Sequence, residues 1–216
     1  MLYYIVHSVL RLLFLLLTRR KIEGRENIPR RGAVIFISNH IELVDSPLLW
    51  TGLGRKVYFM AKEEVFHPRI IGYCMRSFGA FPVRKGRQDR KALLKAQQLL
   101  AEGKALTIYP EGMRSQSQKV NLAFHGAALI ASRSGAPIIP IGIYGTEKIK
   151  GLGWILHRPQ ISLNIGKPFT LPPIEGRPTK HELAKLTDII MEHVTDTLPR
   201  KYHGYYRTRS LNVTEG

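Results

Sequence analysis

Residues 33–45 read Ala-Val-Ile-Phe-Ile-Ser-Asn-His-Ile-Glu-Leu-Val-Asp, an apolar run followed by a polar turn. The run 33–38 has the length and apolar character of a buried strand. His40 and Asp45 follow this run, and residues five positions apart do not share one face of a helix, so we expect the pair to lie on a turn. An imidazole that titrates near neutral pH, oriented by a carboxylate, is a suitable general base.

A second apolar run, residues 105–109, also ends in polar residues, because Pro-Glu-Gly-Met-Arg-Ser follows it at 110–115. Open α/β sheets bind ligands at the carboxyl ends of their strands. We therefore expect His40 and Asp45 to share one site with Glu111 and Arg114. A guanidinium binds phosphate through two parallel hydrogen bonds, whereas the alternative interpretation of Glu111 and Arg114 is an ordinary surface ion pair.

The remaining apolar runs predict alternating strands and helices. We expect strands at residues 33–38, 56–61, 80–83, 105–109, 138–144 and 160–165. We expect helices at the start of the chain, from Pro47, and over 68–78, 89–101, 124–134 and 179–199, the last of which begins with a capping box. This alternation predicts the α/β class, with a largely parallel or mixed central sheet covered by helices and with an N-terminal membrane-associating helix.

The chain divides into an apolar N-terminal helix (1–21), a central domain (22–199) and a basic C-terminal tail (200–216). Residues 1–17 are shorter than the ~20 apolar residues of a spanning helix, and their positive charges follow rather than precede them, unlike in a secretory signal. We expect an interfacial helix on a membrane, the alternative being a helix packed on the protein's own core. We expect the tail to be solvated, the alternative being a membrane contact.

The charge and cysteine content restrict the partners and the compartment. The net charge of +17 and the pI near 10.3 indicate a polyanionic partner: nucleic acid, anionic lipid or a phosphorylated substrate. A single cysteine excludes an intrachain disulfide and favours a reducing compartment. The chain has no Gly-x-Ser-x-Gly nucleophile elbow, no phosphate-binding glycine loop and no dinucleotide fingerprint.

Four short motifs carry a family resemblance. They lie at residues 39–45 (Asn-His, four residues, Asp), 79–85 (Gly-x-x-Pro-Val with basic residues), 110–115 (Pro-Glu-Gly-Met-Arg-Ser) and 136–142 (an apolar run with prolines). In this order and spacing, over about residues 22–170, the chain resembles the glycerolipid acyltransferases, whose best-known members are the 1-acylglycerol-3-phosphate acyltransferases. Met113 stands where the family usually has threonine, and Phe124-His125 stands where it often has a lysine.

The resemblance implies a role for each motif residue. His40 would be the base and Asp45 its partner. The residues to which it assigns substrate binding are Asn39, Arg84, Lys85, Glu111, Gly112, Arg114 and Ser115. Arg84 and Lys85 are alternative matches for one basic residue, which would hold the acceptor phosphate together with Arg114, and the Gly112 amide would face the oxyanion.

The resemblance also implies the reaction and its location. A fatty acyl group would pass from acyl-CoA or acyl carrier protein to the free hydroxyl of 1-acylglycerol-3-phosphate, giving phosphatidic acid. No metal or other cofactor and no nucleic acid is implied, and the enzyme would work at an anionic membrane on its cytoplasmic face. The alternatives are another acceptor, either glycerol-3-phosphate or a lysophospholipid, and a basic membrane- or nucleic-acid-binding protein without catalysis.

Overall fold

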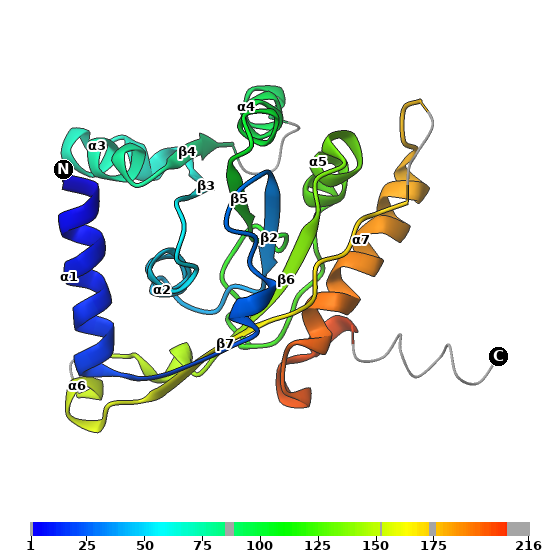
Figure 1. The fold of residues 1–216 in the computed structure, drawn as a ribbon. Helices are drawn as coiled ribbons and strands as arrows, with labels where there is room; N and C mark the ends of the chain where they lie inside the picture. The colour runs from blue at the N-terminus through cyan, green and yellow to red at the C-terminus, as the bar shows by residue number, and fades with distance from the viewer. Residues whose placement is uncertain (1, 85–88, 152, 173–175, 207–216) are drawn as a thin grey trace.

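The computed structural model describes residues 2–84, 89–151, 153–172 and 176–206. Seven strands form one sheet in the order β1-β7-β6-β2-β5-β3-β4, with helices on both of its faces (Figure 1). Neighbouring strands pair in parallel except β6 and β7, which are antiparallel. The predicted α/β class with a mixed central sheet is confirmed.

The strands are β1 (Arg19–Glu23), β2 (Val34–Ser38), β3 (Val57–Lys62), β4 (Ala80–Val83), β5 (Ala105–Ile108), β6 (Ile138–Tyr144) and β7 (Gln160–Ile165). The helices are α1 (Leu2–Leu17), α2 (Asp45–Gly52), α3 (Arg69–Ser77), α4 (Arg90–Ala101), α5 (Gly126–Ser134), α6 (Trp154–His157) and α7 (Lys180–Asp196). Every predicted strand is present, and the expected capping box begins α7, where the Thr179 side chain accepts from the N–H of Glu182.

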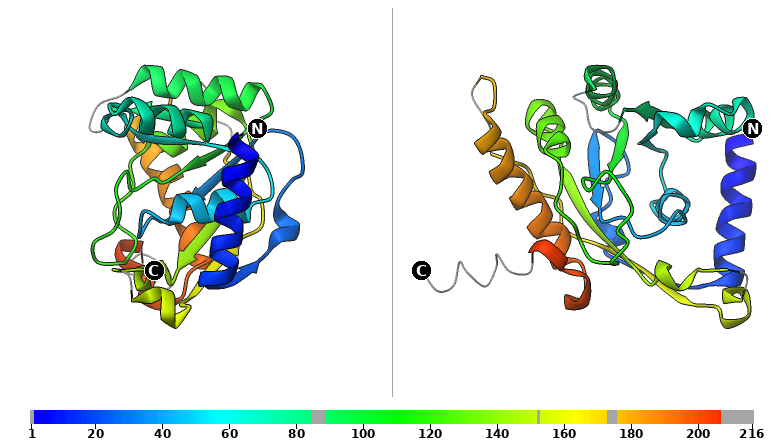
Figure 2. Two further views of the ribbon diagram at one scale, coloured as in Figure 1. Left: turned by 90° about the vertical axis from the view of Figure 1, so that its left-hand side faces the viewer. Right: turned by 180° about the vertical axis from the view of Figure 1, so that it is seen from behind.

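Strand β2 lies in the middle of the sheet and is buried on both faces because every one of its residues is apolar or small. Its side chains alternate between two cores. Ile35 and Ile37 pack in the core under α4, α5 and α7, whereas Val34 and Phe36 pack in the core under α1 and α2. Two further views show the same layers (Figure 2). This packing fixes the end of β2, and therefore the turn that follows it, relative to the rest of the sheet.

Residues 19–23 form an edge strand that the sequence interpretation did not contain, since it placed 19–21 with the N-terminal helix and 22–31 in a connector. β1 pairs in parallel with β7, and its burial alternates along the strand. Ile22 packs against the core while Arg19, Lys21 and Glu23 are exposed. The strand was missed because a short edge strand with charged outward residues has little apolar signal.

Residues 200–206 are not a solvated tail. Two short 3-10 helices, Arg200–Tyr202 and Gly204–Tyr206, bury Tyr202 and Tyr206 in a small cluster with Ile41 and Val120. The sequence interpretation of this part as solvated is therefore wrong, because alternating aromatic residues among cations bury their rings while the cations stay outside. Residues 207–216 lie outside the described part of the chain.

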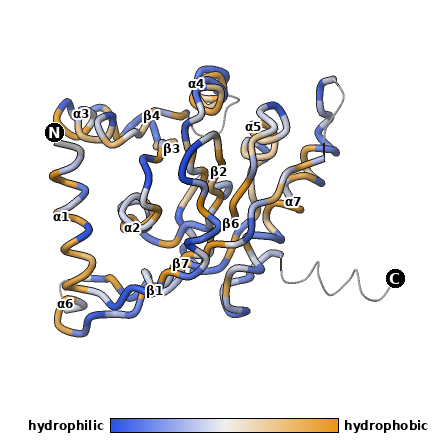
Figure 3. Tube along the Cα trace, in the orientation of Figure 1, coloured by the Kyte–Doolittle hydropathy of each residue, from blue (hydrophilic) through white to orange (hydrophobic). Residues whose placement is uncertain are grey.

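Helix α1 has two different faces. Its inner face, with Leu10 and Phe14, packs on the core and on α2, where the rings of His7 and Trp50 meet edge to face. Its outer face is apolar and exposed, and the helix is largely hydrophobic along its length (Figure 3). Among the described residues, no helix combines the length and apolarity needed to cross a membrane.

Candidate active site

The turn after β2 holds His40 and Asp45 together. Oδ2 of Asp45 accepts from Nδ1 of His40 at 2.8 Å and from the backbone N–H groups of Ile41 at 2.6 Å and Glu42 at 2.8 Å. Asp45 is 0% exposed and is the first residue of α2, whereas the His40 side chain is 16% exposed. With the Nδ1 proton directed at the carboxylate, Nε2 is the nitrogen that can accept a proton from a bound hydroxyl.

Tyr109 contacts the face of the imidazole. Its ring stacks on His40 with 4.2 Å between centroids and 18° between planes, and its hydroxyl lies 3.2 Å from Oγ of Ser46 in α2. Burial raises the pKa of Tyr109 above its usual range, so the hydroxyl stays protonated and is not an acid or base near neutral pH. Sequence reasoning missed Tyr109 because it was assigned to the strand 105–109, although β5 ends one residue earlier, at Ile108.

Glu111 lies under the site rather than in its mouth. It is 2% exposed, and its carboxylate accepts from the backbone N–H of His40 at 3.2 Å and of Asn121 at 2.8 Å. Burial raises the pKa of Glu111 to about 7, against the opposing effect of these hydrogen bonds. Through one side chain, Glu111 thus ties the His40 turn to the loop at Asn121, a residue that sequence reasoning did not single out.

Asn39 and Ser115 also make contacts within the protein. The Asn39 amide donates to the carbonyl of Ile143 in β6 and accepts from its N–H, both at 2.8 Å. The N–H of Ser115 donates to the carbonyl of His40 at 2.8 Å. The N–H of Gly112 donates to the carbonyl of Tyr109 at 3.0 Å. These contacts hold the two loops in place around His40.

Of the predicted phosphate ligands, Arg114 lies beside the His40 turn and Arg84 lies farther away. Nη1 of Arg114 lies 3.8 Å from a carboxylate oxygen of Glu42, so Arg114 reaches the His40 turn. Arg84 follows β4 at the margin of the sheet, and its Nε donates to Glu63 at 2.8 Å, an interaction that lowers the pKa of Glu63. Lys85 lies outside the described residues.

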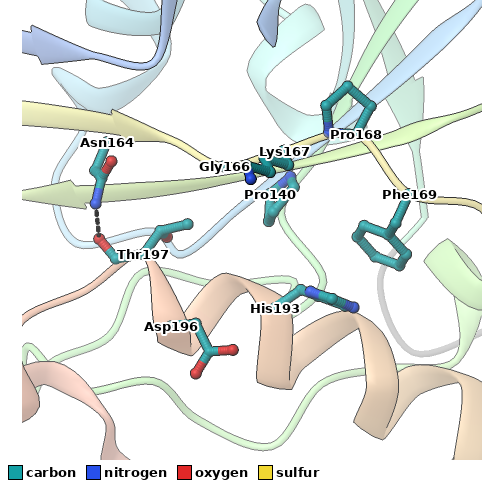
Figure 4. Close-up of a pocket in the computed structure, with 9 residues that line it drawn as sticks. All are labelled: Pro140, Asn164, Gly166, Lys167, Pro168, Phe169, His193, Asp196 and Thr197. Atoms are coloured by element: carbon teal, nitrogen blue, oxygen red, sulfur yellow. Dashed lines mark hydrogen bonds between the residues drawn. The ribbon is translucent and has the colours of Figure 1, made fainter.

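A surface pocket of about 390 Å³ lies elsewhere, between the end of β7 and the end of α7 (Figure 4). Since β7 runs antiparallel to β6, this pocket is at the opposite end of β6 from His40. Its polar groups have local partners: Asn164 donates to the Thr197 carbonyl at 2.9 Å, and the ring of His193 stacks on Phe169 at 4.0 Å. Of the residues in the four motifs, only Pro140 is among the described residues that line it.

The arrangement around His40 can accept a proton from a hydroxyl placed at Nε2. In the described ranges, His, Cys, Asp and Glu residues form no group of three that could hold a metal ion. The structure brings together Asn39, His40, Asp45, Glu111, Gly112, Arg114 and Ser115. Arg84 also follows the carboxyl end of a strand on this side of the sheet, but it forms a separate ion pair with Glu63.

The chain is similar in sequence to named acyltransferases and in fold to a solved structure. A chloroplastic 1-acyl-sn-glycerol-3-phosphate acyltransferase of Arabidopsis thaliana is 32% identical over 153 residues, covering 68% of this chain and 43% of that protein. A 1-acyl-sn-glycerol-3-phosphate acyltransferase of Bacillus subtilis is 29% identical over 177 residues, covering 82% of this chain and 86% of that protein. The chain spans less than half the length of its chloroplastic relatives.

The crystal structure of the 1-acyl-sn-glycerophosphate acyltransferase PlsC from Thermotoga maritima matches with a TM-score of 0.68 and 27% identity. The match covers 90% of this chain and 78% of that one. The Acyltransferase family matches residues 19–144, which include the His40 turn and the Glu111 loop and make up more than half of the chain. The chain therefore belongs to the Acyltransferase family.

Proposed function

We propose that the protein transfers a fatty acyl group from acyl-CoA or acyl carrier protein to the free hydroxyl of 1-acylglycerol-3-phosphate, giving phosphatidic acid. The observation that carries the proposal is the hydrogen bond between Nδ1 of His40 and the buried Asp45 carboxylate. The names of the relatives from Arabidopsis thaliana and Bacillus subtilis support the choice of acceptor.

The proposed reaction needs one base and no cofactor. Nε2 of His40 takes the proton of the acceptor hydroxyl as its oxygen attacks the thioester carbonyl carbon. Asp45 keeps the imidazole oriented and stabilises the imidazolium. The tetrahedral intermediate then collapses, the carbon–sulfur bond breaks, and the leaving thiolate takes the proton from the imidazolium. A thiol with a pKa near 8.5 is a good leaving group, so little further acid catalysis is needed.

We assign the acceptor phosphate to Arg114. Its side chain is half-exposed and lies beside the His40 turn, 3.8 Å from a carboxylate oxygen of Glu42. Arg84 follows β4, which lies three strands from β2, or roughly 14 Å at the usual strand spacing. We therefore propose Arg114 as the primary phosphate ligand, with Arg84 or Lys85 as the second. Asn39, Glu111 and Ser115 act by positioning the loops rather than by touching the substrate.

Four exposed apolar side chains, together called the apolar rim, lie on the loops that carry the motifs or directly follow them: Leu43, Met113, Leu122 and Phe124. Leu43 lies between His40 and Asp45, and Met113 replaces the threonine of the family motif. Exposed apolar groups beside a charged centre suit a substrate with both a phosphate and an acyl chain, and we propose that the rim contacts the chains of acceptor and donor.

We also propose that the enzyme works on a membrane through the outer face of α1. The exposed residues of this face recur at helical spacing: Ile5, Val9, Leu12, Leu13 and Leu16. A 16-residue helix is about 24 Å long, and its inner face packs on the core, so it lies along the surface rather than crossing it.

A product screen tests the proposed reaction. Purified protein is incubated with acyl-CoA or acyl carrier protein and a panel of acceptors: 1-acylglycerol-3-phosphate, glycerol-3-phosphate and lysophospholipids with larger headgroups. Mass spectrometry should find phosphatidic acid, and the His40→Ala variant should form it ~10²–10⁴-fold more slowly. A product from glycerol-3-phosphate or from a lysophospholipid alone would change the acceptor, and no product from any pair would refute acyl transfer.

The phosphate assignment makes a separate prediction. Arg114→Ala should raise the KM for the phosphorylated acceptor roughly ten- to a hundredfold, because a charge-assisted hydrogen-bond partner is lost. The KM for the acyl donor should change little. Steady-state kinetics with each substrate varied in turn distinguishes the two, and Arg133→Ala, an exposed arginine on α5, is the control. An effect on the donor KM alone would place Arg114 at the CoA group.

A further inference from the structure

Arg20 is a partly buried cation that forms no ion pair with any of the described residues. Two of its guanidinium nitrogens, Nε and Nη1, are buried, and neither has a hydrogen-bond partner in the described part of the chain. Arg20 and Ile22 lie on the face of β1 that α1 covers. The acidic residue of the strand, Glu23, points to the other face and pairs with Lys21 at 2.7 Å. Buried charges are normally paired, so this guanidinium lacks an anion.

Arg20 lines a pocket of about 260 Å³ where α1 ends and β1 begins. Leu15, Arg20, Ile22 and Arg25 line it, and it is defined here as the Arg20 pocket. Half of its lining residues are arginines and half are aliphatic. Such a lining suits a ligand with an anionic head and an apolar neighbour, rather than a fully hydrated inorganic ion.

Other cations lie around the pocket. Burial, followed by the charges of Arg11 and Arg25, lowers the pKa of Arg20. Nη2 of Arg158 donates to the carbonyl of Leu15 at 3.2 Å, which brings a further guanidinium to the end of α1. A guanidinium stays charged in proteins, so these groups repel one another until an anion enters. A phosphate in the pocket would relieve the repulsion and supply the guanidinium of Arg20 with a counter-ion.

The position of the pocket identifies the source of the phosphate. Leu15 belongs to the exposed side of α1 and is followed by Leu16 on the outer face. The pocket therefore opens beside the surface that faces the membrane in the proposed function. β1 lies three strands from β2, roughly 14 Å at the usual spacing, so the pocket is separate from the His40 site.

We propose that the Arg20 pocket binds the phosphate of a phospholipid headgroup in the anionic leaflet on which α1 rests, with Leu15 and Ile22 against the glycerol and acyl boundary. The site holds the enzyme on anionic lipid and is distinct from the acceptor site. The inference rests on the membrane contact of the proposed function and is independent of the acyl-transfer reaction.

Vesicle binding of the whole protein tests this site without catalysis. Arg20→Met removes the guanidinium but keeps an unbranched side chain of similar length. It should lower partition onto vesicles that contain anionic phospholipid roughly ten- to a hundredfold. Arg133→Met makes the same change of charge on α5, far from the pocket, and should lower it at most about fivefold. Arg25→Met, at an exposed position of the same pocket, should behave like Arg20→Met and cannot fail through misfolding of the core.

Thermal unfolding in buffer without an added anion provides a second measurement. Because Arg20→Met removes an unpaired buried charge, its Tm should equal or exceed that of the wild type while its vesicle binding falls. A merely structural arginine would instead lower the Tm. Inorganic phosphate and glycerophosphate should shift the Tm of the wild type only weakly.

Two results would overturn the assignment. If Arg20→Met and Arg25→Met bind vesicles as well as Arg133→Met does, the pocket does not contact a headgroup. If free phosphate gives a large shift that depends on Arg20 while vesicle binding does not depend on it, the site takes a soluble phosphate rather than a lipid. A protein that binds vesicles through Arg20 but transfers no acyl group would refute the proposed reaction and leave this inference standing.

Discussion

At the scale of single residues, His40, the proposed base, is held by three contacts. Asp45 accepts from Nδ1 of His40, the Tyr109 ring stacks on the imidazole face, and Glu111 accepts from the backbone N–H. Each contact comes from a different part of the molecule: the start of α2, the residue after β5 and the loop that follows it. An imidazole restrained in this way keeps Nε2 in one direction without a conformational search during each turnover.

The stacked ring makes the first prediction at this scale. Tyr109→Leu should lower kcat roughly tenfold with little change in either KM, because the imidazole loses a contact worth about 0.5–1.5 kcal/mol that orients it. Tyr109→Phe keeps the ring and should retain most of kcat, losing only the contact with Ser46. Equal losses in both variants would show that the hydroxyl, rather than the ring, matters.

The buried carboxyl of Glu111 makes a prediction about stability. Its pKa is about 7 in the folded protein, against 4.5 for an ordinary glutamate. Between these values the folded protein binds more protons than the unfolded chain, so this group lowers stability as pH rises from about 4.5 to 7. In Glu111→Gln this contribution is absent. Relative to the wild type, the variant should therefore gain about 2–3 kcal/mol in unfolding free energy between about pH 5 and pH 8.

Urea unfolding of both proteins at the two pH values measures this change. The variant loses the hydrogen bonds to His40 and Asn121 at both pH values. This loss cancels when the difference in unfolding free energy between variant and wild type is compared at the two pH values. A difference that does not move with pH would show that Glu111 titrates like an exposed carboxyl.

At the scale of elements, the segment 200–206 supports the loop that follows the Glu111 motif. The N–H of Val120 donates to the Tyr202 carbonyl at 2.9 Å, and the N–H of Tyr205 donates to the Val120 carbonyl at 3.0 Å. The N–H of Ala123 donates to the Tyr206 hydroxyl at 3.3 Å. Because Asn121 in this loop donates to Glu111, the C-terminal segment is connected to the base through one intermediate side chain.

Removing one buried tyrosine tests that connection. Tyr206→Ala should lower the unfolding free energy by about 3 kcal/mol or more, because a buried aromatic ring is lost, and should also lower kcat as the loop loosens. Tyr205→Ala, its half-exposed neighbour, should change both quantities little. The comparison uses thermal unfolding and steady-state rates, and similar effects in the two variants would contradict the proposed support.

At the scale of the whole molecule, apolar surface gathers on one side. Of the nineteen exposed large apolar side chains in the described ranges, seven lie on α1, three on α3 and two on α6. These helices lie on one side of the protein, with α3 near the start of α1 and α6 near its end (Figure 2). None of the three contains an acidic residue, which fits an anionic surface as the partner.

Helix α3 should therefore share the membrane contact with α1. Ile70 is 81% and Ile71 49% exposed, so replacing both by glutamine should not disturb the core. The double variant should bind anionic vesicles roughly tenfold less tightly, because apolar area no longer enters the leaflet. Leu94→Gln, exposed on α4 over the other face of the sheet, is the control.

Cosedimentation with vesicles measures the effect, and assays in detergent should show unchanged turnover. Binding equal to that of the wild type would place α3 away from the membrane. If the wild type is a dimer and the α3 variant is a monomer, this side is instead an interface between two copies of the chain.

Most strands and the His40–Asp45 pair were predictable because their signals are local. The apolar run before His40, the spacing of His40 and Asp45, and the capping residues of α7 each depend on a few consecutive positions. β1 was not predictable, because its pairing with β7 compensates for a charged sequence. The inner face of α1 was likewise ambiguous, since an apolar helix packs equally well on lipid or on a core.

The sequence by itself determined the α/β class, the order of the strands along the chain, and the residue types brought to the ends of β2 and β5, because periodicity and turn chemistry are written in neighbouring positions. Only the tertiary structure decided how the functional side chains are used. Asn39 bonds to Ile143, 104 residues away, and Glu111 accepts from the backbone N–H of His40. Two guanidinium nitrogens of Arg20 have no partner among the described residues. These contacts depend on which segments meet when the chain folds. The cost of burying a polar group arises only in the folded protein, so the sequence pattern does not reveal which polar groups are buried.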